Sequence, residues 1–257
     1  MKNTNPAGEG VKMSENAEEC VAGEQFDLKK IVDLRGDVYA FFSRGISREI
    51  DKNYLEWLRN FLPLLDEIGK QNSDGLYLAG VKGLRDFVDN IGDEDELIEE
   101  YARKFTSLFL NVSPNDVLPH IHPFESVYLS AEKLVMQDQR DEVVEFYARF
   151  GLGVDKGFKE PEDHIAAELS FISSLNTQMS GDLAGSASIS VVAEKLEAQK
   201  EFMETHLLRW VHLMGEDLKK ADENGFYGSM SDAMLGYIRI DYNFLKELVE
   251  YVKNEVQ

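Results

Sequence analysis

The stretch at residues 160–175 reads EPEDHIAAELSFISSL, and it decides the fold. Pro161 suits the first turn of a helix, where the N–H that proline lacks has no partner to lose. Glu162 and Asp163 follow it, and acidic side chains are favourable at a helix N-terminus. The sequence therefore predicts a helix that begins near Pro161 and buries one face. Its apolar residues recur at spacings of four, three and three: Ile165, Leu169, Ile172 and Leu175.

A second strip of the same helix has a different character. His164, Glu168 and Phe171 are spaced by four and three residues, so they share one side of the helix beside the apolar stripe. A buried stripe next to a polar and aromatic strip indicates a helix that supports the fold and borders a site.

Most of the remaining chain shows the same helical spacing, and no alternating run of apolar and polar residues predicts a strand. We therefore predict an all-α fold, a single bundle-like domain of about ten helices over residues 25–257. Residues 1–24 lack apolar periodicity and are expected to form a flexible tail. The other predicted helices cover residues 26–42, 47–68, 73–91, 93–110, 138–150, 191–220, 226–237 and 244–251.

Local signals predict where helices begin and end. Ser47 is a candidate cap for the second helix, and Asp93 with Glu96 resembles a capping box for the fourth. Pro63 should bend or break the second helix, because proline removes a backbone hydrogen bond. The pattern over residues 191–220 is unusually long, so we expect a break near His206.

Three segments are predicted to connect helices rather than to form them. Residues 111–125 contain three prolines, which predicts a surface loop. Residues 151–160 contain three glycines, which predicts a hinge, and residues 180–188 read as a polar connector.

The composition limits the classes of partner. Asp plus Glu number 48 against 27 Lys plus Arg, giving a formal net charge of −21. This excess disfavours nucleic acid and anionic lipid and favours basic partners, although it could also serve solubility alone. Cys20 is the single cysteine, so no internal disulfide can form, and no N-terminal apolar segment has signal-peptide length. We expect a soluble cytoplasmic protein.

Two further motifs accompany the first. An L-F pair at Leu108 and Phe109 precedes a proline-containing loop, which ends in a P-aromatic-x-S-x-aromatic pattern at residues 123–128. An H-L-x-x-W pattern occupies residues 206–210 and is followed by an F-Y pair at residues 226–227. Together with E-P-x-D-H and E-L-x-F at residues 160–171, these motifs resemble the TorD/DmsD/NarJ family, the cytoplasmic maturation chaperones of molybdenum enzymes.

The resemblance implies a binding protein rather than an enzyme. Such a chaperone would bind a molybdopterin-dependent oxidoreductase subunit through its twin-arginine signal peptide. It would hold back export and keep the apoenzyme competent for insertion of the molybdopterin cofactor. Some members of the family serve enzymes that lack an export signal. Members of the family can also exchange halves between protomers, so we expect mainly monomer and a minor swapped dimer that uses the hinge at residues 151–160.

The resemblance also implies a set of peptide-binding residues. Asp163 and His164 would accept the basic end of the peptide, and an apolar groove would take the rest. The alternative is that the aromatic residues only pack in a core, that Asp163 serves only the helix N-terminus and that His164 makes only an internal hydrogen bond. The implied residues are Leu108, Phe109, Pro123, Phe124, Ser126, Tyr128, Asp163, His164 and Glu168.

The sequence gives less support to the hypothesis that the protein is an enzyme. A metal-dependent helical-bundle enzyme could use His120, His122, His164 and Glu168, since the first pair and the second pair each have ligand spacing. However, the H-E-x-x-H and paired Glu-x-x-His motifs are absent from the sequence, and so are phosphate-binding and nucleophile-elbow motifs. We therefore expect no cofactor and no functional metal.

Overall fold

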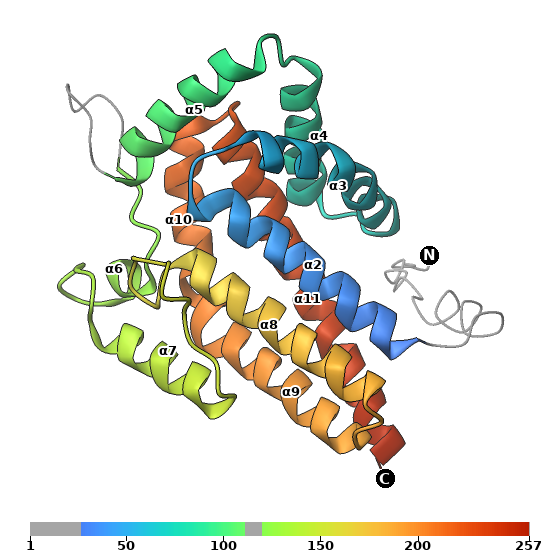
Figure 1. The fold of residues 1–257 in the computed structure, drawn as a ribbon. Helices are drawn as coiled ribbons and strands as arrows, with labels where there is room; N and C mark the ends of the chain where they lie inside the picture. The colour runs from blue at the N-terminus through green and yellow to red at the C-terminus, as the bar shows by residue number, and fades with distance from the viewer. Residues whose placement is uncertain (1–26, 111–119, 257) are drawn as a thin grey trace, which may run out of the picture.

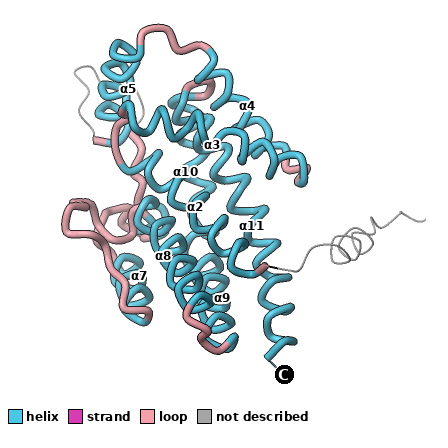
Figure 2. Tube along the Cα trace, turned by 45° about the vertical axis from the view of Figure 1, so that its right-hand side comes forward, coloured by secondary structure: helices cyan, strands magenta, loops and turns pink. Residues whose placement is uncertain are grey.

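The computed structural model describes residues 27–110 and 120–256, and this part of the chain is helical with no strand (Figures 1 and 2). The all-α prediction is confirmed. The predicted tail and much of the proline-containing loop lie outside the described residues. The helices are α2 (Leu28–Ser47), α3 (Lys52–Gln71), α4 (Gly75–Asp89), α5 (Glu94–Phe109), α6 (Glu125–Leu129), α7 (Asp138–Arg149), α8 (Ile165–Ala184), α9 (Ile189–Phe202), the π-helical turn η1 (Met203–Leu207), α10 (Leu208–Asp222) and α11 (Phe226–Val256).

Aspartates begin the first four of these helices. In each case the carboxylate accepts a hydrogen bond from a backbone N–H in the first turn, which satisfies a donor that has no partner within the helix. Asp93 caps α5 as predicted. Ser47 does not cap α3, because it is the last residue of α2; Asp51 does so, accepting from the N–H of Tyr54 at 2.7 Å.

Several predicted interruptions are not found. Pro63 was predicted to bend or break its helix, and α3 does not break there but continues to Gln71. Helix α8 extends to Ala184, through half of the predicted connector, and α11 is one helix where two were predicted. Near His206 the helix does not break but widens into η1, between α9 and α10. A π-turn absorbs an extra residue without ending the helix.

The two halves of the chain interleave. Helix α2 packs along α8, α4 packs along α11, and α9 and α10 also contact α11 (Figure 1). Four of these helices, α2, α8, α9 and α11, run nearly parallel to one another in Figure 1. The core is therefore built by helices from both sides of the predicted hinge.

The contact between α4 and α11 depends on glycine. A Cβ at Gly80 would lie 2.1 Å from the backbone nitrogen of Ala233, and one at Gly236 would lie 2.5 Å from the backbone of Tyr77. No side chain larger than hydrogen fits at either position, so the two helices can approach this closely only because both residues are glycine.

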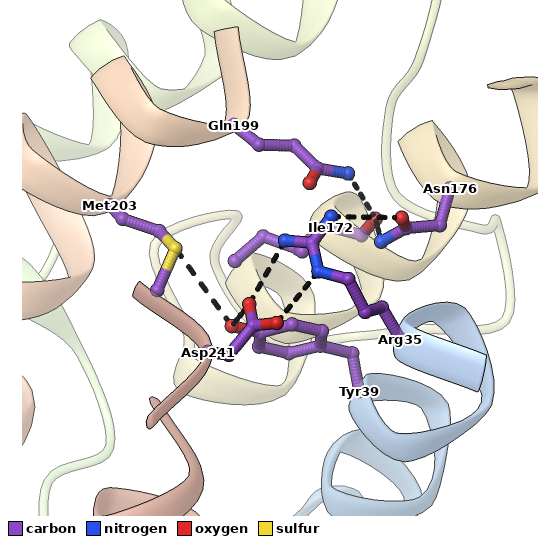
Figure 3. A network of polar contacts seen from close by, with 7 residues as sticks. All are labelled: Arg35, Tyr39, Ile172, Asn176, Gln199, Met203 and Asp241. Carbon is purple, nitrogen blue, oxygen red and sulfur yellow. Dashed lines mark hydrogen bonds and ion pairs between the residues drawn. The ribbon is translucent and has the colours of Figure 1, made fainter. Parts of the chain in front are cut away.

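A buried ion pair joins α2, α8 and α11 (Figure 3). Arg35 of α2 donates from Nε and Nη2 to both carboxylate oxygens of Asp241 in α11, at 2.6 and 2.9 Å. Tyr39 donates its hydroxyl to the same carboxylate at 2.7 Å, and Arg35 Nη1 donates to Asn176 Oδ1 of α8 at 3.2 Å. The pair is bidentate and further hydrogen-bonded, which is the arrangement that offsets the cost of burying two charges.

Candidate functional site

Two of the motifs meet through their backbones. Phe124 and His164 form an isolated antiparallel β-bridge between the segment before α6 and the segment before α8. The N–H of Glu125 donates to the carbonyl of Asp163 at 3.0 Å, and the N–H of Ile165 donates to the carbonyl of Pro123 at 2.8 Å. The motifs at residues 123–128 and 160–171 therefore form one unit, although nearly forty residues separate them along the chain.

The start of the signature helix differs from the prediction. Helix α8 begins at Ile165 with His164 as its N-cap, so Pro161 and Asp163 precede the helix and do not lie in its first turn. Asp163 is fully buried, and its Oδ2 accepts a hydrogen bond from the N–H of Ser126 at 2.9 Å. The carboxylate thus serves the N-terminal turn of α6, which belongs to a different segment from its own helix.

His164 is held as a neutral side chain. Its Nδ1 accepts a hydrogen bond from the N–H of Ala166 at 3.0 Å, which leaves the ring proton on Nε2. Burial lowers the pKa of His164 to about 3, because the charged imidazolium would lose its water. The ring lies edge-on between Phe124 and Phe158, with ring centroids 5.2 and 5.5 Å away.

Two buried glutamates connect these segments to the third motif. Glu125 Oε2 lies 2.9 Å from Nδ1 of His206 in η1, and Glu168 Oε2 accepts from Nε1 of Trp210 in α10 at 3.2 Å. Burial raises the pKa of both carboxyl groups, that of Glu168 well above its usual value. The charge of Glu125 raises the pKa of Glu168 further, whereas His206 opposes the shift at Glu125. Glu168 is therefore held in its neutral form over a wider range of pH than an exposed glutamate.

Tyr128 completes the connection at the protein surface. Its ring stacks on Trp210 with centroids 5.6 Å apart, and its hydroxyl donates to Asp217 at 3.1 Å. We call the set Glu125, Ser126, Asp163, His164, Glu168, His206 and Trp210 the motif cluster. It joins α6, α8, η1 and α10, so all three sequence motifs contribute to a single buried assembly.

Most of the implied peptide-binding residues lie under the surface. Phe109 and Tyr128 are partly exposed, and Phe109 packs against Phe105 and Tyr227. The expectation that Phe124 lies at the surface is wrong, because only 8% of it is exposed. Burial against His164 and the β-bridge account for this position. The implied residues that are buried are Leu108, Pro123, Phe124, Ser126, Asp163, His164 and Glu168.

A cavity of about 170 Å³ lies beside α8, and we call it the α8 groove. Its walls come from Ser43 and Ser47 of α2, from the α8 face that includes Ser170 and Phe171, and from residues 152–158. Phe171 belongs to the strip that the sequence analysis placed at the border of a site. The predicted hinge segment therefore contributes one side of a cavity.

The four proposed metal ligands do not form a site. Among the described residues, no three side chains of His, Cys, Asp or Glu are grouped so that they could hold an ion. Nδ1 of His164 instead accepts from the N–H of Ala166, and Oε2 of Glu168 accepts from Trp210. His120 Nδ1 lies 3.3 Å from the carbonyl of Ser107.

Sequence reasoning missed the acid that links the motifs. Glu125 lies between Phe124 and Ser126, both of which were chosen, yet it is completely buried and contacts His206. The presence of a charged residue inside an otherwise apolar and aromatic motif could have indicated a buried polar contact. Arg35 is a second such case, since it falls on the apolar face of its helix, between Val32 and Val38.

Comparison with known proteins places these motifs in a family. The model of the nitrate reductase delta subunit family matches residues 75–215, which is more than half of the chain. A protein of Vibrio parahaemolyticus named chaperone protein TorD is 28% identical over 224 residues, covering 85% of this chain and 98% of that protein. A chaperone protein TorD of Vibrio cholerae is 27% identical over 229 residues, covering 87% and 97%.

One solved structure also matches. It is described as a redox enzyme maturation protein from Archaeoglobus fulgidus, with 19% identity, a TM-score of 0.41 and coverage of 88% of this chain and 98% of that one. No helix within residues 27–110 and 120–256 is long and apolar enough to cross a membrane.

The relatives are named as chaperones, in agreement with the expectation of a binding protein rather than an enzyme. The family match covers α4 to α10 for most of their length, and it includes all the residues of the motif cluster. This chain belongs to the nitrate reductase delta subunit family, and its curated relatives include the TorD chaperones.

Proposed function

We propose that this protein is a cytoplasmic chaperone for the maturation of a molybdoenzyme. It binds a newly made molybdopterin-dependent oxidoreductase subunit through a twin-arginine signal peptide and keeps the apoenzyme competent for cofactor insertion before export. The observation that carries the proposal is the similarity to chaperone protein TorD over nearly the whole length of both chains.

The charge of the protein supports a basic ligand. A net charge of −21 attracts arginine side chains at long range and raises the rate of encounter at low ionic strength. Binding requires no covalent chemistry, and the neutral state of His164 and the raised pKa of Glu168 suit a buried supporting role. These residues would act by positioning α6 and α8, while accessible residues such as Tyr128 would contact the peptide.

A peptide-binding measurement tests the proposal. A fluorescein-labelled peptide with two adjacent arginines and a following apolar segment is titrated with the full chain, and anisotropy is recorded at low and high salt. We expect saturable binding that weakens as salt rises, because exposed charge pairs are screened. The matched control replaces both arginines by glutamine and keeps the apolar segment, and it should bind more weakly.

Two outcomes would count against parts of this function. Equal binding of the two peptides would remove arginine recognition from the mechanism. Isolation of the chain from native cells without any molybdopterin-dependent subunit, under conditions where such an enzyme is being made, would count against the client.

A further inference from the structure

The loop between α6 and α7 carries three consecutive exposed apolar side chains, and it projects at the edge of the molecule (Figure 1). Leu134 and Met136 are each 58% exposed, and Val135 is 41% exposed. Burying three such side chains would release ordered water and is favourable, so their joint exposure is a cost in the isolated chain.

The backbone holds these side chains outward. Lys133 and Met136, on either side of the pair Leu134 and Val135, have φ angles of 53° and 62°. Non-glycine residues rarely adopt this left-handed conformation, because the Cβ crowds the backbone. The loop thus accepts local strain immediately before Leu134 and at Met136 itself.

A hollow of about 330 Å³ adjoins the base of this loop. Lys133 lines it, together with Val127 and Tyr128 of α6 and Leu213 of α10. Tyr128 is therefore both a member of the second motif and a wall of this hollow, and its ring rests on Trp210 of the motif cluster. The motif cluster fixes the relative position of the two helices that form the hollow.

Carboxylates surround the hollow. Glu216 and Asp217 of α10 line it, and Glu132 precedes Lys133 in the loop. Glu216 and Glu132 are exposed, and neither makes an ion pair with another residue of the described ranges. Asp217 is shared between Tyr128 and Lys220. Unpaired carboxylates beside exposed apolar groups match a ligand that is apolar and carries arginines.

We propose that this surface, made by Leu134, Val135, Met136 and the hollow beside Tyr128, is where an apolar peptide segment preceded by arginines docks. We call it the α6–α7 surface. The apolar segment packs on the loop and on Tyr128 and Leu213, and the arginines lie toward Glu216 and Glu132. The inference rests on the proposed function and assigns a place to its ligand.

The α8 groove is a less suitable place for the same ligand. It is smaller, at about 170 Å³, and among the described residues that line it no large apolar side chain is strongly exposed. Size and exposure therefore both favour the α6–α7 surface.

The test compares variants of the two surfaces with the labelled twin-arginine peptide. The double variant Leu134→Ser/Met136→Ser removes exposed apolar area from the loop, and Ser170→Trp fills the α8 groove. Leu34→Ser/Phe244→Ser is the control, because it removes two exposed apolar residues on α2 and α11, at 39% and 38% exposure. Thermal unfolding of each variant establishes that it is folded.

We expect the loop variant to bind the peptide on the order of tenfold more weakly or worse, because two buried side chains contribute to the complex. Ser170→Trp and the control should bind as wild type. If Ser170→Trp loses binding and the loop variant does not, the α6–α7 surface is the wrong place and the proposed function still stands. If wild type itself does not bind the peptide, both the inference and the signal-peptide part of the function fail.

A charge variant tests the orientation of the peptide. Glu216→Gln should weaken binding at low salt, and the difference from wild type should shrink at high salt, where the interaction is screened. With the peptide in which both arginines are replaced by glutamine, Glu216→Gln should have no effect. An equal loss of affinity for both peptides would place the arginines elsewhere.

Discussion

At the scale of single residues, the signature side chains support the site from beneath the surface. Asp163 and His164 act on two different helices: the carboxylate caps α6, and the imidazole caps α8. A side chain that is buried and bonded to backbone N–H groups cannot reach a peptide without giving up those bonds. In the proposed function, its effect on peptide binding passes through the helices that it positions.

The first prediction concerns Asp163→Asn. The amide can still accept from the N–H of Ser126, but a charge-assisted bond becomes a neutral one, so we expect a loss of about 1 kcal/mol in the free energy of unfolding. Peptide affinity should change little, because the carboxylate is fully buried. Urea unfolding and peptide anisotropy are measured on the same sample.

Asp89→Asn is the control for that experiment, since Asp89 is an exposed acid at the end of α4, outside the two candidate peptide surfaces. A loss of affinity with unchanged stability in Asp163→Asn would mean that Asp163 contacts the peptide directly.

The second prediction concerns Glu168 and pH. Burial raises the pKa of Glu168 in the folded state above the value of about 4.3 expected in the unfolded chain. The folded state then binds more protons than the unfolded state, so the contribution of Glu168 to stability is full below about pH 4.3 and is lost as pH rises through the folded pKa. Glu168→Gln is neutral at every pH and lacks this loss.

The midpoint of thermal unfolding should therefore shift in favour of Glu168→Gln, relative to wild type, as pH rises from about 5 to 8. His164 is present in both proteins, so its own pH dependence cancels in the comparison. Glu125 interacts with Glu168, so the same comparison is repeated in a Glu125→Gln background. A difference in midpoint that stays constant over this range would show that Glu168 is ionised in the folded protein.

At the scale of helices, the close approach of α4 and α11 requires glycine at particular positions of the sequence. Glycines at positions 80 and 236 allow the two backbones to meet, and Tyr77 and Ala233 are the residues they meet. Packing at this distance excludes side chains between the helices, so it tolerates no added volume.

The third prediction therefore concerns Gly80→Ala. The added methyl group would overlap the backbone of α11, and we expect a loss of roughly 1–3 kcal/mol or more in the free energy of unfolding. Gly75→Ala is the matched control on the same helix, because nothing lies within 4 Å of a Cβ there. That change should be neutral or stabilising by up to about 1 kcal/mol. Equal effects of the two substitutions in urea unfolding would contradict the close packing.

At the scale of the whole molecule, helices on the two sides of residues 151–160 depend on each other. The pairs α2–α8 and α4–α11 each join the two halves of the chain, and so does the ion pair between Arg35 and Asp241. An exchange of halves between two copies would preserve these contacts and change only the connecting segment, which is why swapping costs little.

The fourth prediction is a mainly monomeric protein with a minor, slowly exchanging swapped dimer. Gly151 has a φ of 65°, so Gly151→Ala strains the connection in the monomer and should raise the dimer fraction. Gly153→Ala is the control, because it has open space around the Cβ and no positive φ. Sizing chromatography of isolated dimer at low concentration measures the exchange, and a rapidly equilibrating dimer would argue against swapping.

The sequence by itself determined the features that depend on neighbours along the chain. The spacing of apolar residues predicts the helices, because residues three and four apart share a helix face, and Asp93 was recognisable as a cap from its own position. The motifs also predict the family, since they place particular residue types at fixed intervals along the chain. The prediction of a break near His206 was wrong, and at Pro63, where a bend or a break was predicted, the helix does not break. Packing against other helices outweighed these ambiguous local signals.

Only the tertiary structure decided what the motif residues do. The contacts of Asp163 with Ser126, of Glu168 with Trp210 and of Glu125 with His206 join residues 37, 42 and 81 positions apart. No periodicity within one segment encodes such a partner, so a carboxylate that reads as a surface binding group can be buried and bonded. The same holds for Phe124, which is buried against His164, and for Leu134 and Met136, which are exposed. Burial depends on which other segments cover a side chain, and that is settled only when the helices pack.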